Sequence, residues 1–394
     1  MEALTFEQAR ACVLEAVRPL PGEECLPLAE AAGRVLSRDM LADRDQPALA
    51  RSVRDGYALR AADLPGTLTC IGEIRAGEQW TGSLGKGQTL AIMTGAPVPS
   101  GADAVAMVEH CRVDGNQVTP TKPVAAGDFI DPAGSMCRAG DVVLRRGQRL
   151  DYAGLGVLAS IGAQTAPVFP RPKVAIIATG DELVELHERP APHQVRNSNR
   201  HSLEAQVTRA GGLANVLPIA RDSLDATRSL IEKGLQADLL LLSGGVSAGK
   251  YDVVEHALKE LGAEFYFDRI LIQPGQPLVF GRCRGKFFFG LPGNPSSTMV
   301  CFEVFARAAL EKLAGETEPM LPLLESVLAE EVRVRPGLTR FLPARLSADG
   351  KSIRQVPWQG SGDIAALARG NCFLVTEPDH DHYAAGERIR VLLR

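Results

Sequence analysis

The stretch that decides the fold is ADLLLLSGGVSAGKYD, which runs from Ala237 to Asp252. Leu239 to Leu242 form an unbroken apolar run, a pattern typical of a strand that is buried on both faces of a parallel sheet. The glycines and small hydroxyls that follow let backbone N–H groups approach an anion, because no large side chain stands in the way. We therefore predict a strand, an anion-binding turn and a helix start, the place where open α/β sheets bind ligands.

The same turn comes close to the P-loop of nucleotide triphosphatases. Gly244, Gly249 and Lys250 have the required spacing, but Tyr251 occupies the position of the hydroxyl that would bind Mg²⁺. We therefore favour an anion-binding turn over a P-loop, with a purely structural glycine turn as the alternative. The candidate substrate-binding residues of this turn are Ser243, Gly244, Gly245 and Ser247.

Strands and helices alternate from Lys173 to about Gly315, which predicts a central three-layer α/β domain around a mostly parallel sheet. The expected strands are Val174–Ala178, Ala214–Ile219, Asp238–Leu242, Glu264–Ile272, Pro277–Phe280 and Lys286–Phe289. The expected helices are Ser202–Ala210, Ser223–Leu235, Val253–Leu261 and one that follows Pro295.

The flanking segments have a different texture. Thr5 and Gln8 have the spacing of a capping box at the start of a first helix, and a short second helix is expected near Leu28–Ala32. Short strand-like runs between dense turns predict a β-rich inserted domain, and five more runs after Pro319 predict a small C-terminal β domain. The predicted domains are an elongated N-terminal segment at 1–42 and 141–170, the insertion at 43–140, the α/β domain at 171–316 and the C-terminal domain at 317–394.

Composition excludes several classes of protein. The chain is 45% hydrophobic and 23% charged, which is typical of a folded globular protein rather than a disordered one. Its net charge of −4 supplies no basic field for nucleic acid or an anionic membrane, and no apolar run approaches the roughly 20 residues of a membrane helix. The eight cysteines are scattered singly, as reduced thiols are. We expect a cytoplasmic protein with no nucleic-acid or membrane partner.

Carboxylates follow three of the expected strands. Asp181 and Glu182 end the segment KVAIIATGDEL, Asp222 follows the next strand, and Asp252 ends the opening stretch. Because the carboxyl ends of parallel strands meet at one edge of a sheet, these acids predict a site for Mg²⁺ and phosphate. Acids that only cap helices are the alternative.

A second glycine- and proline-rich segment, FGLPGNPSS, precedes the last helix of the α/β domain. Asn294 is a good N-cap and Pro295 suits the first helical position, so a stiff helix entry explains most of this composition. It leaves Ser296 and Ser297 to face whatever binds at the sheet edge. A related turn, Gln273–Pro277, lies upstream.

Taken together, the motifs resemble the molybdopterin molybdenumtransferases and the related C-terminal domain of gephyrin, in order and over essentially the whole chain. The segments that carry the resemblance are SVRDGYAL, IMTGAPVPSGADAVAMVE, ATGDEL, NSNR, SGGVSAGKYD, PGQP, GLPGNPSS, TRF and QGSGD. Two of these segments, SGGVSAGKYD and GLPGNPSS, are also similar to molybdopterin adenylyltransferases, which would match only the α/β domain. The flanking motifs favour the first family.

The resemblance implies a defined reaction. Molybdate enters the dithiolene of adenylylated molybdopterin while the pyrophosphate is cleaved, which releases AMP and molybdenum cofactor and requires Mg²⁺. It also implies a homodimer with shared active sites. The alternatives are an adenylyltransferase or nucleotide pyrophosphatase of the same fold, or a non-enzymatic scaffold of the gephyrin kind.

The resemblance also implies roles for individual residues. Asp222 and Asp252 would bind Mg²⁺ and the pyrophosphate, Glu182 would lie close by, and Asp55 and Thr94 would act from the inserted domain. Arg340 and Ser361 would contact the oxyanion from the C-terminal domain. The other implied substrate-binding residues are Ser247, Gln273, Gln276, Pro292, Asn294, Pro295 and Ser297.

One departure from the family pattern concerns charge. Gln273 and Gln276 occupy positions where many members have lysines, and glutamine donates hydrogen bonds without supplying charge. We therefore expect oxyanion docking to depend more strongly on Arg340, with Arg54 as a candidate compensating charge.

Overall fold

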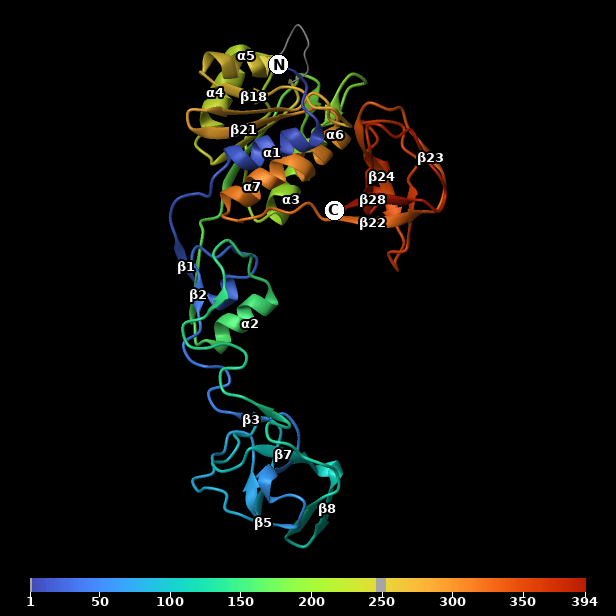
Figure 1. Ribbon diagram of the computed structural model, residues 1–394. Helices are drawn as coiled ribbons and strands as arrows, with labels where there is room; N and C mark the ends of the chain where they lie inside the picture. The colour runs from blue at the N-terminus through green and yellow to red at the C-terminus, as the bar shows by residue number, and fades with distance from the viewer. Residues whose placement is uncertain (1, 246–252) are drawn as a thin grey trace. The chain divides into compact units, whose positions relative to one another are not determined.

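The computed structural model describes residues 2–245 and 253–394, so the predicted site residues Ser247 and Asp252 lie outside the described residues. The chain divides into two compact units (Figure 1). The first unit comprises Met1–Arg38, Arg146–Asp151 and Thr165–Arg394, and the second comprises Asp39–Arg145 and Tyr152–Gln164. Among the described residues, no helix has the length and apolar character needed to cross a membrane.

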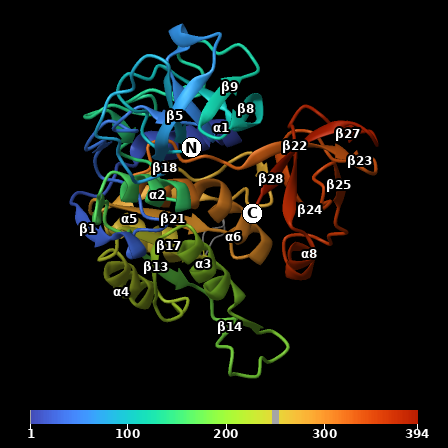
Figure 2. The ribbon, with the colours of Figure 1, turned by 90° about the horizontal axis from the view of Figure 1, so that it is seen from below.

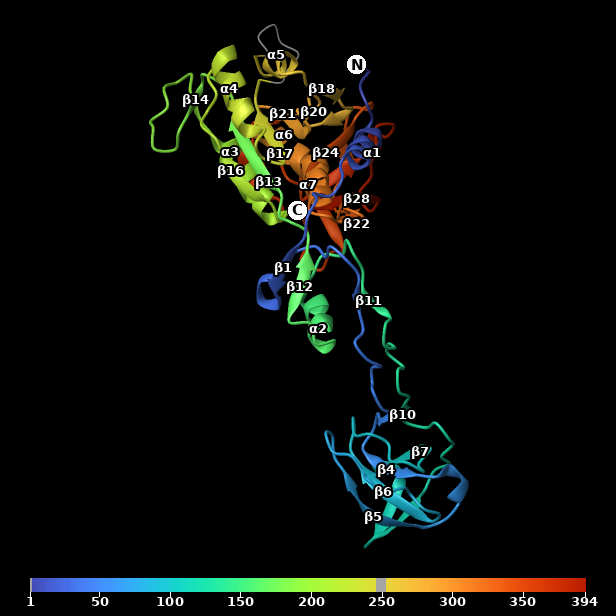
Figure 3. The ribbon, with the colours of Figure 1, turned by 90° about the vertical axis from the view of Figure 1, so that its left-hand side faces the viewer.

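The first unit contains a six-stranded sheet in the order β16-β13-β17-β21-β20-β18 (Figures 1 and 3). The first four strands are parallel to one another, and β20 runs antiparallel to both of its neighbours, β21 and β18, so the sheet is mixed. Its strands are β13 (Lys173–Ala178), β16 (Leu213–Val216), β17 (Leu239–Ser243), β18 (Glu264–Phe267), β20 (Val279–Cys283) and β21 (Lys286–Leu291).

Helices cover both faces of this sheet. Leu239 and Leu241 of β17 pack into one core, whereas Leu240 and Leu242 pack into a separate core. The first core takes residues from α1, α3, α6 and α7, and the second takes residues from α4 and α5. The predicted three-layer α/β domain, with its doubly buried strand, is therefore confirmed. Its helices are α1 (Phe6–Ala16), α3 (Ser198–Arg209), α4 (Leu224–Gly234), α5 (Val253–Glu260), α6 (Pro295–Cys301) and α7 (Arg307–Leu313).

The helical elements of the first core begin and join as their local sequence dictates. The predicted capping box is present, because the Thr5 side chain accepts from the Gln8 N–H and the Gln8 side chain accepts from the Thr5 N–H. A π-helical turn, η4 (Phe302–Ala306), joins α6 to α7. Arg10 of α1 donates to the Val304 carbonyl oxygen at 3.2 Å, which anchors the first helix to this turn.

The C-terminal residues form a separate β layer (Figure 2). Its sheet runs β19-β24-β25-β22-β28-β26, and an additional β24–β26 pairing closes five of these strands into a barrel. The bounds are β19 (Ile272–Gln273), β22 (Leu323–Leu328), β24 (Thr339–Leu346), β25 (Ser352–Gln355), β26 (Cys372–Thr376) and β28 (Arg388–Leu393). The predicted C-terminal β domain is thus confirmed.

One short strand of the α/β segment was predicted in the wrong sheet. Ile272 was expected to end the strand Glu264–Ile272 of the central sheet, but Ile272 and Gln273 pair in parallel with Thr339 and Arg340 of β24. Ile272 is fully buried in the core that also holds Phe341 of the C-terminal domain. Burial of this apolar side chain against the C-terminal domain explains why it joins the C-terminal sheet. The local sequence does not reveal that contact.

The second unit contains the β-rich insertion, whose six-stranded sheet runs β7-β4-β6-β5-β9-β8. The predicted β-rich inserted domain is confirmed. The sheet comprises β4 (Gly56–Leu59), β5 (Leu68–Ile74), β6 (Gln88–Ile92), β7 (Ala104–Met107), β8 (Cys111–Asp114) and β9 (Gln117–Pro120). The unit also contains β2 (Met40–Leu41), β3 (Arg51–Ser52), β10 (Ile130–Asp131), β11 (Val142–Leu144) and α2 (Tyr152–Ser160).

The remaining elements are short, and some differ from expectation. The helix expected near residues 28–32 is only a 3₁₀ turn, Leu28–Glu30. A helix that was not predicted, α8 (Ile364–Arg369), begins where the Asp363 side chain accepts from the Ala366 N–H at 3.0 Å. The other strands are β1 (Glu24–Pro27), β12 (Thr165–Val168), β14 (Leu183–Val184), β15 (Val195–Arg196), β23 (Val332–Arg333) and β27 (His382–Tyr383).

Candidate functional site

Three strand-end loops meet at the carboxyl edge of the central sheet. Gly244 follows β17 with φ +92°, and a Cβ added there would lie 2.7 Å from the Thr179 carbonyl oxygen after β13. A Cβ on Gly293, after β21, would lie 3.5 Å from the Gly244 Cα. Glycine at 244 is therefore required both by its backbone conformation and by the close approach of the neighbouring loop. The structure brings the Ser243–Gly245 turn and the GLPGNP turn together.

Asn199 connects two of these loops. Its Nδ2 donates to the Ser243 hydroxyl at 2.8 Å and to the Gly293 carbonyl oxygen at 2.8 Å. Because the Gly293 carbonyl can only accept, these two bonds fix the orientation of the amide. The buried Oδ1 of Asn199 and the buried hydroxyl of Thr179 have no hydrogen-bond partner within the described part of the chain. The NSNR motif carried the family resemblance, but sequence reasoning missed the role of Asn199.

Acidic residues lie at the adjoining loops. Thr179 and Ala220 form an isolated parallel bridge, and the Asp222 N–H donates to the Asp181 carboxylate at 3.2 Å. The Glu182 carboxylate lies over Gly180, where an added Cβ would be 2.3 Å from its Oε2. Carboxylate oxygens are the ligands that Mg²⁺ prefers, so this donor set fits the metal. In the described ranges no three acidic, His or Cys residues are already grouped as a metal site.

A cavity of about 750 Å³ lies between the α/β domain and the C-terminal barrel. Its wall is built from the Gln273–Pro277 turn, the GLPGNPSS turn and segments of the C-terminal domain. Predicted substrate-binding residues that line it are Gln273, Gln276, Pro292, Asn294, Ser297, Arg340 and Ser361. The structure therefore gathers seven residues from four distant motifs around one cavity.

Asn294 does not act as the predicted side-chain cap of α6. It occupies the N-cap position and Pro295 follows at the start of the helix, but its side chain makes no capping hydrogen bond. Asn294 Nδ2 instead donates to the Ser361 hydroxyl at 2.8 Å, and the Ser296 N–H donates to the Ser361 carbonyl oxygen at 3.0 Å. The competing polar group from the C-terminal domain explains the difference, and these bonds hold the two domains together at the cavity.

Arg340 is held rigidly in the cavity wall. Its Nε and Nη2 donate to the Arg335 carbonyl oxygen at 3.1 and 2.7 Å, and the residue is only 9% exposed. Burial lowers the pKa of the Arg340 guanidinium, and the charge of Arg335 lowers it further. Gln273 lies opposite Arg340 in the β19–β24 pairing. A buried, fixed cation beside an amide donor is suited to bind an oxyanion.

The second unit brings Asp55 and Thr94 together. The Thr94 N–H and hydroxyl both donate to Asp55 Oδ1, at 2.7 and 2.8 Å. The bond from the Thr94 backbone, followed by that from its hydroxyl, lowers the pKa of the Asp55 carboxyl. These bonds therefore favour the ionised form of Asp55 and fix the orientation of its carboxylate. Sequence reasoning selected both residues but not the bonds between them.

This pair gives a first prediction. Thr94→Val removes the hydroxyl donor and keeps the backbone donor, so the pKa of Asp55 should rise part of the way to its ordinary value. The pKa of Asp55 is lower in the folded state than in the unfolded state. Asp55 therefore stabilises the folded protein at pH values above its unfolded pKa, and this stabilisation is lost as pH falls through its folded pKa. Carbon-13 NMR titration of the Asp55 carboxyl measures the shift. Thr94→Ser keeps the hydroxyl donor and should leave the pKa of Asp55 lowered. An unchanged titration in the valine variant would show that the Thr94 hydroxyl does not lower this pKa.

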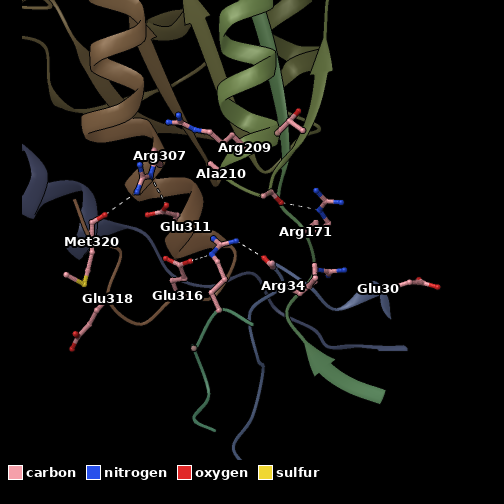
Figure 4. Close-up of a pocket in the computed structure, with 16 residues that line it drawn as sticks. Glu30, Arg34, Arg171, Arg209, Ala210, Arg307, Glu311, Glu316, Glu318 and Met320 are labelled. Atoms are coloured by element: carbon pink, nitrogen blue, oxygen red, sulfur yellow. Dashed lines mark hydrogen bonds and ion pairs between the residues drawn. The ribbon is translucent and has the colours of Figure 1, made fainter. Parts of the chain in front are cut away.

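A second cavity of the first unit, of about 790 Å³, has a structural explanation (Figure 4). Its walls carry arginines and glutamates that pair with one another. Arg307 Nε lies 2.8 Å from Glu311 Oε1, and Arg149 pairs with Glu316. Arg171 Nε donates at 3.1 Å to a main-chain carbonyl oxygen just after α3. Most of these arginines are already paired with glutamates or bonded to main-chain carbonyl oxygens. We therefore place the candidate site at the 750 Å³ cavity and the adjoining sheet edge.

Comparison with protein families finds matches to three regions of the chain. Residues 4–162 match the family described as "MoeA N-terminal region (domain I and II)". Residues 175–312 match the "Probable molybdopterin binding domain", and residues 325–393 match the "MoeA C-terminal region (domain IV)". A molybdopterin molybdenumtransferase of Staphylococcus aureus (strain Mu50) is 30% identical over 376 residues, which span 93% of this chain and 90% of the relative. The chain belongs to the molybdopterin molybdenumtransferase family.

Other members of the family give the same result. A molybdopterin molybdenumtransferase of Staphylococcus epidermidis is 31% identical over 93% of this chain and 90% of its own length. A crystal structure of a molybdopterin biosynthesis moeA protein from Pyrococcus horikoshii OT3 aligns with a TM-score of 0.84, at 27% identity, over 100% of both chains. Another structure of the protein from that genus aligns with a TM-score of 0.77, at 30% identity, over 100% of this chain and 99% of the other.

Arg54, the candidate compensating charge, lies in the second unit. Its Nη1 donates to the Val53 carbonyl oxygen at 3.4 Å. Its contribution to oxyanion binding in this member of the family stays a prediction.

Proposed function

We propose that the protein is a molybdopterin molybdenumtransferase, which inserts molybdate into the dithiolene of adenylylated molybdopterin. In this reaction the pyrophosphate is cleaved and AMP and molybdenum cofactor are released. The observation that carries the proposal is the meeting of two kinds of surface in one unit. Carboxylates and glycine turns lie at the sheet edge, and a cavity with arginines but no Asp or Glu among its described wall residues lies beside the GLPGNPSS turn.

The two surfaces suit the two ends of the reaction. The N–H group of the exposed Gly245 would donate to the pyrophosphate, because no side chain covers it, whereas the Gly244 N–H already donates to the Leu291 carbonyl oxygen at 3.1 Å. Asp222 and Asp252, with Glu182 close by, would hold Mg²⁺, which offsets negative charge on the phosphate oxygens when it is bound. Arg340 and the two glutamines would orient molybdate as the incoming substrate. Ser247, Pro292, Pro295, Ser297 and Ser361 complete the proposed set of binding residues.

Asp55 and Thr94 are proposed as further catalytic residues. Asp55 is an exposed carboxylate whose geometry is fixed by two hydrogen bonds from one neighbour, and a preoriented carboxylate can act as a base or bind a cation. We further propose that the protein is a cytoplasmic homodimer with shared active sites, as the family resemblance implies.

The proposal is tested by incubating the protein with adenylylated molybdopterin and Mg²⁺, with and without molybdate. Release of AMP that depends on molybdate is expected. AMP release that ignores molybdate would favour a nucleotide pyrophosphatase, and no release would favour a scaffold.

A second experiment tests the acidic residues. Asp252→Ala should reduce molybdate-dependent AMP release by about 100-fold or more, because it removes a proposed Mg²⁺ ligand. Asp225→Ala is a matched control on the exposed start of α4, where Asp225 pairs with Arg228. Equal turnover in both variants would refute the role of Asp252.

A further inference from the structure

The walls of the 750 Å³ cavity carry an imbalance of charge. Arg333, Arg335 and Arg340 line it, and no carboxylate does so among the described wall residues. Arg333 is neutralised, since its Nη2 lies 3.5 Å from Glu331 Oε2. In the described ranges, neither Arg335 nor Arg340 has a carboxylate within ion-pair distance. Two positive charges therefore remain uncompensated in this cavity.

The two uncompensated arginines repel each other. The charge of Arg335 contributes to the lowered pKa of Arg340, after the larger effect of burial. Arg340 cannot move away, because its Nε and Nη2 are bonded to the Arg335 carbonyl oxygen. A bound anion would attract both guanidinium groups and offset their mutual repulsion.

The Gln273–Pro277 turn supplies hydrogen bonds to the cavity but no charge. Gln273 and Gln276 lie at the two ends of the Pro274–Gly275 turn, and both side chains are exposed at the cavity. An amide can donate to an oxyanion but cannot balance its charge. A tetrahedral dianion carries two negative charges, which equals the number of uncompensated guanidinium groups.

We propose that Arg335 is a second oxyanion-binding residue, which together with Arg340 supplies the charge that docks a tetrahedral dianion of the molybdate type. The inference rests on the proposed function, since it names which residue selects the charge of the incoming substrate. Arg335 is exposed at the cavity rim, whereas Arg340 is fixed in the wall. Arg335 therefore captures the dianion, and Arg340 with the glutamines orients it.

Direct binding tests the inference without the pterin substrate. Titration calorimetry with molybdate should show that Arg335→Gln binds about 10- to 100-fold more weakly than the unmodified protein, the loss expected for one charge-assisted hydrogen bond. Arg333→Gln is the matched control, because the same cavity loses a charge that Glu331 already neutralises. Its affinity should change by less than about threefold. Equal losses in the two variants, or no loss in Arg335→Gln, would overturn the inference.

A charge-relocation variant separates binding from structure. Arg335→Gln keeps the backbone carbonyl that holds Arg340, so thermal unfolding should not change. Adding Gln276→Lys to Arg335→Gln returns a cation to the cavity and should restore most of the molybdate affinity. Failure of this rescue, together with lowered thermal stability of the single variant, would show that Arg335 acts only structurally.

The outcome is separable from that of the proposed function. If the unmodified protein binds molybdate through Arg335 but releases no AMP, the transferase proposal fails while the assignment of Arg335 stands. If AMP release depends on molybdate and Arg335→Gln binds normally, the assignment of Arg335 fails while the transferase proposal stands.

Discussion

Gly275→Ala is expected to destabilise the protein by about 3 kcal/mol and to weaken oxyanion binding severely. Gly275 has φ +113°, a conformation that a residue with a Cβ rarely adopts. An added Cβ would also lie 2.3 Å from the Sγ of Cys301, which is fully buried in the first core. The turn must therefore shift, and Gln273 and Gln276 move with it. Urea unfolding and molybdate titration measure the two losses.

Two controls divide the cost of this substitution. Gly285→Ala, in the turn between β20 and β21, combines φ +81° with almost open space around the new Cβ, so it reports backbone strain alone. Its cost should be about 1 kcal/mol. Gly275→Ala with Cys301→Ala removes the contact with sulfur and should recover oxyanion affinity more than stability, because the second change leaves a cavity. If Gly275→Ala costs no more stability than Gly285→Ala, packing against Cys301 does not position the turn.

Much of the fold could be predicted because its signals are local. The run Leu239–Leu242 has no polar alternation, and the structure buries alternate leucines in separate cores on the two faces of the sheet. The spacing of Thr5 and Gln8 predicted a capping box that both hydrogen bonds now satisfy. Such patterns require only the residue types and the period of the element, so one sequence is enough to read them.

The site was harder to predict because its contacts join distant segments. Asn294 was a good N-cap by sequence, yet its amide bonds to Ser361, which is 67 residues away. Asn199 joins two loops through bonds to Ser243 and Gly293, and no local pattern distinguishes that amide from an ordinary helix-start asparagine. The exchange of Ile272 into the C-terminal sheet has the same origin. Which residues pair with one another across such long sequence separations depends on how whole domains pack.

Glu303→Ala is expected to cost about 2 kcal/mol in the free energy of unfolding, because it removes a buried carboxylate that accepts charge-assisted hydrogen bonds from partly exposed arginines. Glu303 lies in the π-helical turn and is 5% exposed. Its Oε1 accepts from Gln206 Nε2 at 2.8 Å and from Arg209 Nη2 at 2.6 Å, and its Oε2 lies 3.4 Å from Arg307 Nη1. In the alanine variant Arg209 loses its carboxylate partner, whereas Gln206 keeps the Met299 carbonyl oxygen at 3.1 Å and Arg307 keeps Glu311. Urea unfolding measures the loss.

An exposed ion pair provides the control for the Glu303→Ala variant. Glu325 Oε2 lies 3.5 Å from Arg388 Nη1 in the C-terminal sheet, and both side chains are largely in solvent, so Glu325→Ala should cost less than about 1 kcal/mol. An equal cost for the two variants would refute the importance of the Glu303 network. The consequence reaches the site, because Gln206 and Arg209 lie on α3, the helix that also carries Asn199. Glu303→Ala should therefore loosen the Asn199 contacts to both loops, and Glu303→Gln, which keeps an acceptor for Gln206, should preserve them in part.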